Sequence, residues 1–140
     1  MKKKILIIQG SSLKKINIKT DTSFFLGLEA QRRSYQIYYY EPKDLSFIKG
    51  KVTALCSKVK FVDNPKQPIK VINKTVLNLL QAKLILIRSD PPFNQQYINT
   101  TFIFEHISKK VRIINHPIAL REVPEKLFSL RLTKYMPQTL

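Results

Sequence analysis

Short apolar runs alternate with segments of helical spacing along the chain. Residues 4–8 are almost entirely apolar, as expected for a strand buried on both faces. Residues 20–22 offer helix N-caps, and from Ser23 to Arg33 the apolar side chains recur at helical spacing. Residues 35–40 are rich in tyrosine and predict a second strand. A strand, a helix and a strand in this order predict a βαβ unit with parallel strands.

The alternation continues to the end of the chain, less regularly at first. Helices that alternate with apolar strands indicate an α/β fold, with a mostly parallel sheet and helices on both faces. The remaining predicted elements are short strands at 46–48 and 52–62 with a turn at 49–50, a loop at 65–68, a short helix at 76–81, a strand at 83–87, a helix at 96–109, a strand at 111–114, a helical turn at 117–122 and a helix at 124–132 with Pro124 in its first turn.

Length and composition fit one soluble domain. The chain has 140 residues, 44% of them hydrophobic and 24% charged. No apolar run approaches the roughly 20 residues of a membrane span. The basic start is followed by an apolar stretch, residues 5–8, that is too short for a signal peptide. The single cysteine, Cys56, fits a reducing compartment, and we expect a cytoplasmic protein without membrane association.

The formal net charge of +16 raises the question of nucleic-acid binding. Most of the excess is lysine, and the lysines are spread along the chain rather than grouped in one stretch. A solvated basic surface is therefore the preferred interpretation. Such a surface would also attract anionic ligands such as nucleotides and acidic peptides.

Several kinds of site are missing from the sequence. The three glycines form neither a dinucleotide-binding nor a P-loop motif, so a complete nucleotide site of either kind is not expected. His106 and His116 have no cysteine or carboxylate partners at metal-ligand spacing. No serine or cysteine lies in a recognisable nucleophile motif, so we assign no catalytic residue.

Polar segments follow three predicted strands, at residues 9–19, 88–93 and 115–121. In parallel sheets, ligands collect at the carboxyl ends of the strands. Arg88 could bind a ligand carboxylate there, with Asp90 orienting Arg88 or binding a ligand amine. The alternative, a strand end stopped by two prolines with solvated Arg88 and Asp90, stays open.

Three further residues have simple structural explanations. Asn115 is suited to starting a turn, and Asp21 is suited to capping a helix. Lys126 lies early in a predicted helix, where a lysine is most often exposed. From the residues alone, the sequence indicates a soluble α/β domain with a polar crevice at its strand ends.

Six segments resemble bacterial glutathione synthetases, in the same order and at the same spacing. They cover essentially the whole chain and are specific as a set. The matches are residues 16–24 (INIKTDTSF) to I-N-x-x-K/T-D-[ST]-[ST]-F, 28–33 (LEAQRR) to a helix ending A-Q-R-R-G, 88–93 (RSDPPF) to R-K-D-P-P-F/M, 97–105 to Y/F-x-x-A-T-x-x-L-E, 115–122 to N-x-P…L-R-D/E, and 125–128 (EKLF) to N-E-K-L.

The resemblance implies a pre-ATP-grasp domain with a Rossmann-like parallel sheet over residues 1–123. Residues 124–140 would begin the connection to an ATP-grasp domain. It also implies a reaction in which ATP, γ-glutamylcysteine and glycine give glutathione, ADP and phosphate. In the family, ATP and Mg²⁺ are the cofactors, and cationic groups stabilise the phosphoryl transfer.

The resemblance further implies which residues bind ligands. Lys126 would contact ATP, while neither ATP nor Mg²⁺ is expected to bind tightly to this chain alone. The small-molecule ligand would be γ-glutamylcysteine or glutathione. The residues that would bind it are Arg88, Asp90, Asn115, Lys19, Asp21 and Thr100.

The chain departs from the family pattern at several positions. Gln9, Gly10 and Ser11 stand where an Asp-Pro pair is usual after the first strand. Ser34 replaces the glycine after the arginine pair, Ser89 replaces a basic residue, and Pro124 stands where asparagine is usual.

Family members continue past Leu140 into an ATP-grasp domain, so we expect a truncated product or one half of a split enzyme, inactive alone. A separate ATP-grasp chain would then be its partner. The alternative is a non-catalytic remnant or interaction domain, held as a homo-oligomer. A nucleic-acid-binding protein would instead need lysines clustered on one face with stacking aromatics.

Overall fold

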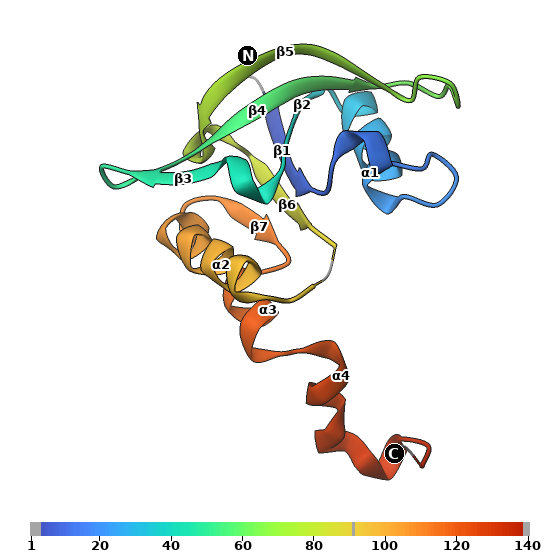
Figure 1. Ribbon diagram of the computed structural model, residues 1–140, viewed down its shortest axis with the longest axis vertical. Coiled ribbons are helices and arrows are strands. Elements are labelled where there is room, and N and C mark those ends of the chain that lie inside the picture. The colour runs from blue at the N-terminus through green and yellow to red at the C-terminus, as the bar shows by residue number, and fades with distance from the viewer. Residues whose placement is uncertain (1–3, 91, 139–140) are drawn as a thin grey trace.

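The computed structural model describes residues 4–90 and 92–138, apart from the side chains of Glu125 and Lys126. In this part of the chain, seven strands form one sheet in the order β3-β4-β2-β1-β6-β7, with β5 paired to β4. Helices pack on both faces of the sheet (Figure 1). The α/β fold is therefore confirmed.

The first part of the sheet is the predicted βαβ unit. It consists of β1 (Lys4–Gly10), α1 (Thr22–Arg32) and β2 (Tyr35–Tyr40), and β1 pairs with β2 in parallel. The Asp21 side chain accepts a hydrogen bond from the backbone N–H of Ser23, so Asp21 caps α1 as the sequence predicts.

The middle of the chain adds antiparallel strands. β3 (Leu45–Ile48) and β4 (Lys51–Phe61) form a hairpin whose turn residues, Lys49 and Gly50, both have positive φ. β5 (Ile69–Asn78) pairs with β4 over nearly its whole length. The predicted helix at 76–81 is therefore wrong, because its first residues complete β5 and only Leu79–Gln81 form a 3₁₀ turn.

These strands make the sheet mixed rather than mostly parallel. The parallel pairs are β1–β2, β1–β6 and β6–β7, while β2–β4, β3–β4 and β4–β5 are antiparallel. The parallel strands lie together, so their carboxyl ends share one edge of the sheet.

The last part of the chain returns to alternating strands and helices. Its elements are β6 (Leu84–Arg88), α2 (Gln95–Ser108), β7 (Arg112–Ile114), α3 (Pro117–Glu122), α4 (Glu125–Phe128) and a 3₁₀ segment, Ser129–Tyr135. The helix predicted at 124–132 is thus shorter, with Pro124 as its N-cap. Figure 1 shows α4 and the 3₁₀ segment after it running away from the sheet. Among the helices described, none has the length and apolar character needed to cross a bilayer.

Two apolar clusters hold the sheet between its helices. On one face, Ile7 of β1 packs in a cluster with Phe104 of α2. On the other face, Leu6 and Ile8 of β1 share a cluster with Phe24 of α1. Neighbouring side chains of β1 thus point to opposite faces, as the apolar run at 4–8 requires for a strand buried on both sides.

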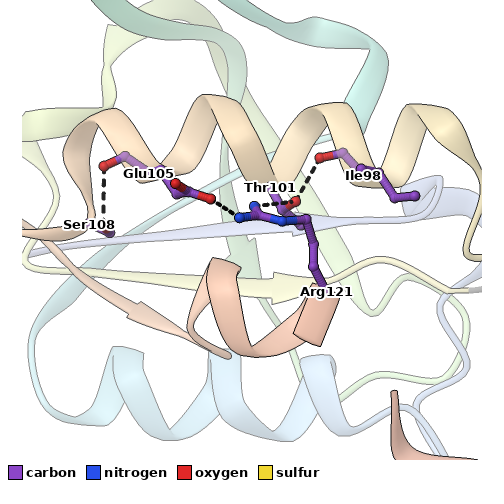
Figure 2. Close-up of polar contacts among 5 residues, drawn as sticks. All are labelled: Ile98, Thr101, Glu105, Ser108 and Arg121. Carbon is purple, nitrogen blue, oxygen red and sulfur yellow. Dashed lines mark hydrogen bonds and ion pairs between the residues drawn. The ribbon is translucent and has the colours of Figure 1, made fainter. Parts of the chain in front are cut away.

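A polar contact fastens α3 to α2. Arg121 of α3 donates hydrogen bonds to Thr101 Oγ1 at 3.0 Å and to the carboxylate of Glu105, with which it also forms an ion pair (Figure 2). Its guanidinium lies 4.0 Å from the centre of the Phe102 ring. The pair is largely shielded, with the Arg121 side chain 16% exposed and that of Glu105 33% exposed.

Candidate functional site

A polar hollow of about 280 Å³ opens at the carboxyl ends of β1 and β6, beside the N-terminus of α1. Parallel pairing brings these two strand ends together, with Gly10 opposite Arg88. The lining residues come mainly from the loop between β1 and α1, with Arg88 and Asp90 contributed by the end of β6. They are Ser11, Ser12, Lys15, Ile16, Asn17, Thr20, Asp21, Thr22, Ser23, Tyr39, Arg88 and Asp90.

The structure brings three of the predicted ligand-binding residues together in this hollow. Arg88, Asp90 and Asp21 all line it, and Lys15 adds a second cation. None of these four takes part in an ion pair within 4.0 Å among the residues that the structure describes. The hollow therefore presents two cationic and two anionic side chains that do not neutralise each other in direct contact.

A chain of hydrogen bonds joins three of the residues that line the hollow. The Tyr39 hydroxyl donates to the backbone carbonyl of Ser11 at 2.7 Å. The Ser11 hydroxyl in turn donates to Oδ2 of Asp90 at 2.6 Å. The end of β2 is thereby connected, through the loop after β1, to the loop after β6.

A second chain of hydrogen bonds lies beside the first, deeper in the protein. The Tyr40 hydroxyl donates to Gln9 Oε1 at 2.9 Å, and Gln9 Nε2 donates to the Ser89 hydroxyl at 3.1 Å. Gln9 is buried, which a polar residue tolerates when its amide is hydrogen-bonded on both sides. Neither Tyr40, Gln9 nor Ser89 lines the hollow.

Burial raises the pKa of both tyrosines. For Tyr39, the nearby carboxylates of Asp21 and Asp90 raise the pKa further. For Tyr40, burial raises the pKa well above 10.0. Both hydroxyls therefore stay protonated at neutral pH and remain hydrogen-bond donors.

The other predicted ligand-binding residues lie outside this hollow. Lys19 and Asn115 are exposed and do not line it. Thr100 is 6% exposed, and its hydroxyl donates to the backbone carbonyl of Gln96 within α2. The Lys126 side chain, predicted to contact ATP, lies outside the described residues.

Sequence reasoning missed Tyr39, Ser11 and Lys15 as parts of the site. The polar segment at 9–19 was a usable signal for Ser11 and Lys15, since it follows a predicted strand of a parallel sheet. For Tyr39 no local signal exists, because a tyrosine in the run at 35–40 reads first as a strand residue.

The described residues do not fit a metal site. Over residues 4–90 and 92–138, no group of three or more His, Cys, Asp or Glu side chains could hold a metal ion. The hollow itself offers two carboxylates, and both accept a hydrogen bond from the protein. Because the hollow has both positively and negatively charged side chains, it is better suited to an organic ligand with positive and negative groups than to a metal cation.

Comparisons with known proteins agree with one another. The sequence matches the family described as "Prokaryotic glutathione synthetase, N-terminal domain" over residues 4–121. It is 39% identical to the glutathione synthetase of Mesorhizobium japonicum over 140 residues, which make up 100% of this chain and 44% of that protein. It is 39% identical to the glutathione synthetase of Buchnera aphidicola over 130 residues, which make up 92% of this chain and 41% of that protein. It is 41% identical to the glutathione synthetase of Wigglesworthia glossinidia brevipalpis over 126 residues, which make up 89% of this chain and 40% of that protein. The chain thus spans less than half the length of these relatives.

Proposed function

The chain belongs to the prokaryotic glutathione synthetase family, whose N-terminal domain it matches, and we propose that it supplies the γ-glutamylcysteine-binding part of such a synthetase. In the proposed reaction, ATP phosphorylates the cysteinyl carboxylate of γ-glutamylcysteine, and the amine of glycine then displaces phosphate to give glutathione. The part of this chain in that reaction is to bind and orient the dipeptide.

The hollow at the strand ends carries this proposal. γ-Glutamylcysteine has two carboxylates and one ammonium group, and the hollow offers Arg88 and Lys15 as cations. An arginine can hold a carboxylate through two parallel hydrogen bonds. The volume of about 280 Å³ is close to the lower end of ligand pockets, about 300 Å³.

We place the ATP and Mg²⁺ sites mainly outside this chain. ATP and Mg²⁺ supply the phosphoryl transfer in the family, and the described residues hold no cluster of metal ligands. In this proposal, residues 1–123 form the substrate-binding domain of a cytoplasmic enzyme, and residues 124–140 lead toward an ATP-grasp domain in the same or a separate chain. Lys126 is the residue proposed to contact ATP.

Calorimetric titration with γ-glutamylcysteine tests the binding role. Arg88→Ala should weaken binding by roughly tenfold or more, the loss expected for a hydrogen bond between charged groups. Arg112→Ala is the matched control, because Arg112 is also exposed but begins β7 and does not line the hollow. Unchanged binding by Arg88→Ala would overturn the assignment of Arg88.

Phosphate release tests whether this chain needs a separate ATP-grasp domain for catalysis. The purified chain, mixed with ATP, Mg²⁺, γ-glutamylcysteine and glycine, is expected to release no phosphate above the rate without the chain. Phosphate release is expected once the ATP-grasp domain of a relative is added and assembles with this chain. Release by this chain alone would show that it holds a complete catalytic site.

A non-catalytic interaction domain is the second candidate. Its support is a set of exposed apolar side chains in the segment that leaves the sheet, since surfaces of this kind usually meet another protein. The exposed residues are Leu127, Phe128, Leu130, Leu132 and Tyr135. Self-association without γ-glutamylcysteine binding, measured by light scattering and calorimetry, would favour this candidate over the first.

A further inference from the structure

The charges in the hollow suit the amino-acid end of a ligand. An α-amino acid group carries an ammonium and a carboxylate on one carbon atom, so it needs a cation and an anion close together. Arg88 and Asp90 are two residues apart at the end of β6, and both line the hollow without forming an ion pair with each other. γ-Glutamylcysteine has such a group on its glutamyl residue.

Asp90 is held in a defined position. Its Oδ2 atom accepts a hydrogen bond from the Ser11 hydroxyl at 2.6 Å. Its Oδ1 atom accepts no hydrogen bond from the residues that the structure describes. One oxygen is therefore fixed by the protein, and the other is left for a donor on the ligand.

Ser11 is in turn held by Tyr39. Tyr39 is 3% exposed as a residue, and its hydroxyl donates to the Ser11 carbonyl at 2.7 Å. The same hydroxyl occupies the space beside Gly10, where any other residue would place its Cβ atom. Because the ring is packed in the core cluster beside α1, it provides a fixed support for the loop that carries Ser11.

Asp21, the other carboxylate of the hollow, is a weaker candidate for binding the α-ammonium group of the ligand. Its Oδ1 atom accepts the Ser23 N–H at the start of α1, where the partial positive charge of the helix end already stabilises a carboxylate. Asp21 also comes from a different element than Arg88, whereas Asp90 lies only two residues after Arg88 in the chain.

Resting on the proposed function, we propose that Tyr39, acting through Ser11, positions the Asp90 carboxylate to accept the α-ammonium group of γ-glutamylcysteine while Arg88 binds the neighbouring carboxylate. Tyr39 is then a positioning residue, and Asp90 determines specificity for a ligand with a free amino group.

Two ligands test the assignment of Asp90. N-Glutarylcysteine is γ-glutamylcysteine with hydrogen in place of the α-ammonium group. By calorimetry, the unmodified chain should bind γ-glutamylcysteine roughly tenfold more tightly, as expected for one hydrogen bond between charged groups. Equal binding of both ligands would overturn the ammonium assignment alone, whereas binding of neither would overturn it together with the proposed function.

Tyr39→Phe tests the positioning role, because it removes the hydroxyl and keeps the ring. It should remove most of the preference for the ammonium-bearing ligand. Tyr40→Phe is the matched control, since it also removes a buried hydroxyl that donates a hydrogen bond, but its partner Gln9 does not line the hollow. That variant should keep the preference. Equal weakening of both ligands by Tyr39→Phe would indicate a purely structural role and overturn the positioning proposal.

Amide resonances give a readout that needs no ligand. In nitrogen–proton correlation spectra, Tyr39→Phe and Ser11→Ala should each shift the backbone amide of Asp90, because both interrupt the chain of hydrogen bonds that ends there. An Asp90 resonance that stays in place in both variants would overturn the positioning role even if the chain binds γ-glutamylcysteine.

Discussion

The hydroxyl of Tyr39 fills the space that a side chain at Gly10 would occupy. Gly10 ends β1, and the ring of Tyr39 comes from the neighbouring strand β2. Glycine at this position is therefore required by a close approach of a side chain rather than by an unusual backbone conformation.

Gly10→Ala should accordingly destabilise the protein. The added Cβ atom would displace a buried ring, and overpacking of this kind costs about 1–3 kcal/mol. Urea unfolding followed by circular dichroism measures the loss. In the Tyr39→Phe background the cost should be smaller, because the nearest atom is the hydroxyl oxygen. An equal cost in both backgrounds would contradict this account.

Ser34→Gly should stabilise the protein. Ser34 follows α1 with φ of 64°, the left-handed conformation that most often carries glycine after a helix. Replacing serine removes a strain of about 1 kcal/mol, reduced somewhat by the greater freedom of glycine in the unfolded chain. The midpoint of urea unfolding should rise. Ser34→Ala keeps the Cβ atom and is expected to bring no gain.

Arg121→Ala should lower the free energy of unfolding by about 2 kcal/mol, because it leaves a shielded Glu105 carboxylate without its partner. Arg33→Ala is the matched control. Arg33 also pairs with a glutamate, Glu29, but both side chains are largely exposed, and such pairs contribute about 0.5 kcal/mol or less. Equal effects of the two substitutions in urea unfolding would contradict the importance of the α2–α3 contact.

Stability should fall in alkali. Burial raises the pKa of Cys56 from 9.0 to about 12, and it also raises the pKa of Tyr39 and Tyr40 above 10.0. Above pH 9 the unfolded chain loses these protons first, so the unfolded state binds fewer protons and the free energy of unfolding decreases as pH rises. The stabilising contribution is complete below pH 9 and is lost progressively toward pH 12.

Urea unfolding at a series of pH values from 8 to about 11 measures this slope, since it follows the difference in bound protons. Tyr40→Phe removes one titrating group, so its slope should be shallower than that of the unmodified chain. A slope unchanged by this substitution would show that Tyr40 titrates alike in both states.

Local patterns predicted the parallel part of the fold well. The run at 35–40 forms β2 with the predicted bounds, and Asp21 caps α1 as predicted. Both predictions succeeded because buried strands and helix caps depend on residues that are near neighbours in sequence. The segment at 76–81 was predicted wrongly for the opposite reason. Val76 is 65% exposed and belongs to β5 through its pairing with Leu55, a contact between distant residues that no local spacing reveals.

The candidate site was predictable in part. Arg88 and Asp90 could be placed from the rule that ligands gather at strand ends. The role of Gln9 could not, because the residue looks like the start of a polar loop and is buried only through its bonds to Tyr40 and Ser89. Which of the tyrosines in β2 supports the loop after β1 likewise depends on sheet geometry.

The contact of Arg121 with Glu105 also determines where the end of the chain can move. Because Arg121 fastens α3 to α2, and Phe104 of α2 packs in the core cluster on the sheet, we expect α3 to move together with the sheet. A pivot for the residues beyond it can lie no earlier than Val123, whose backbone has already left the helical conformation. A spin label on α3 is therefore expected to tumble with the sheet, and a label at Leu130 would measure whether the residues beyond Val123 tumble independently of it.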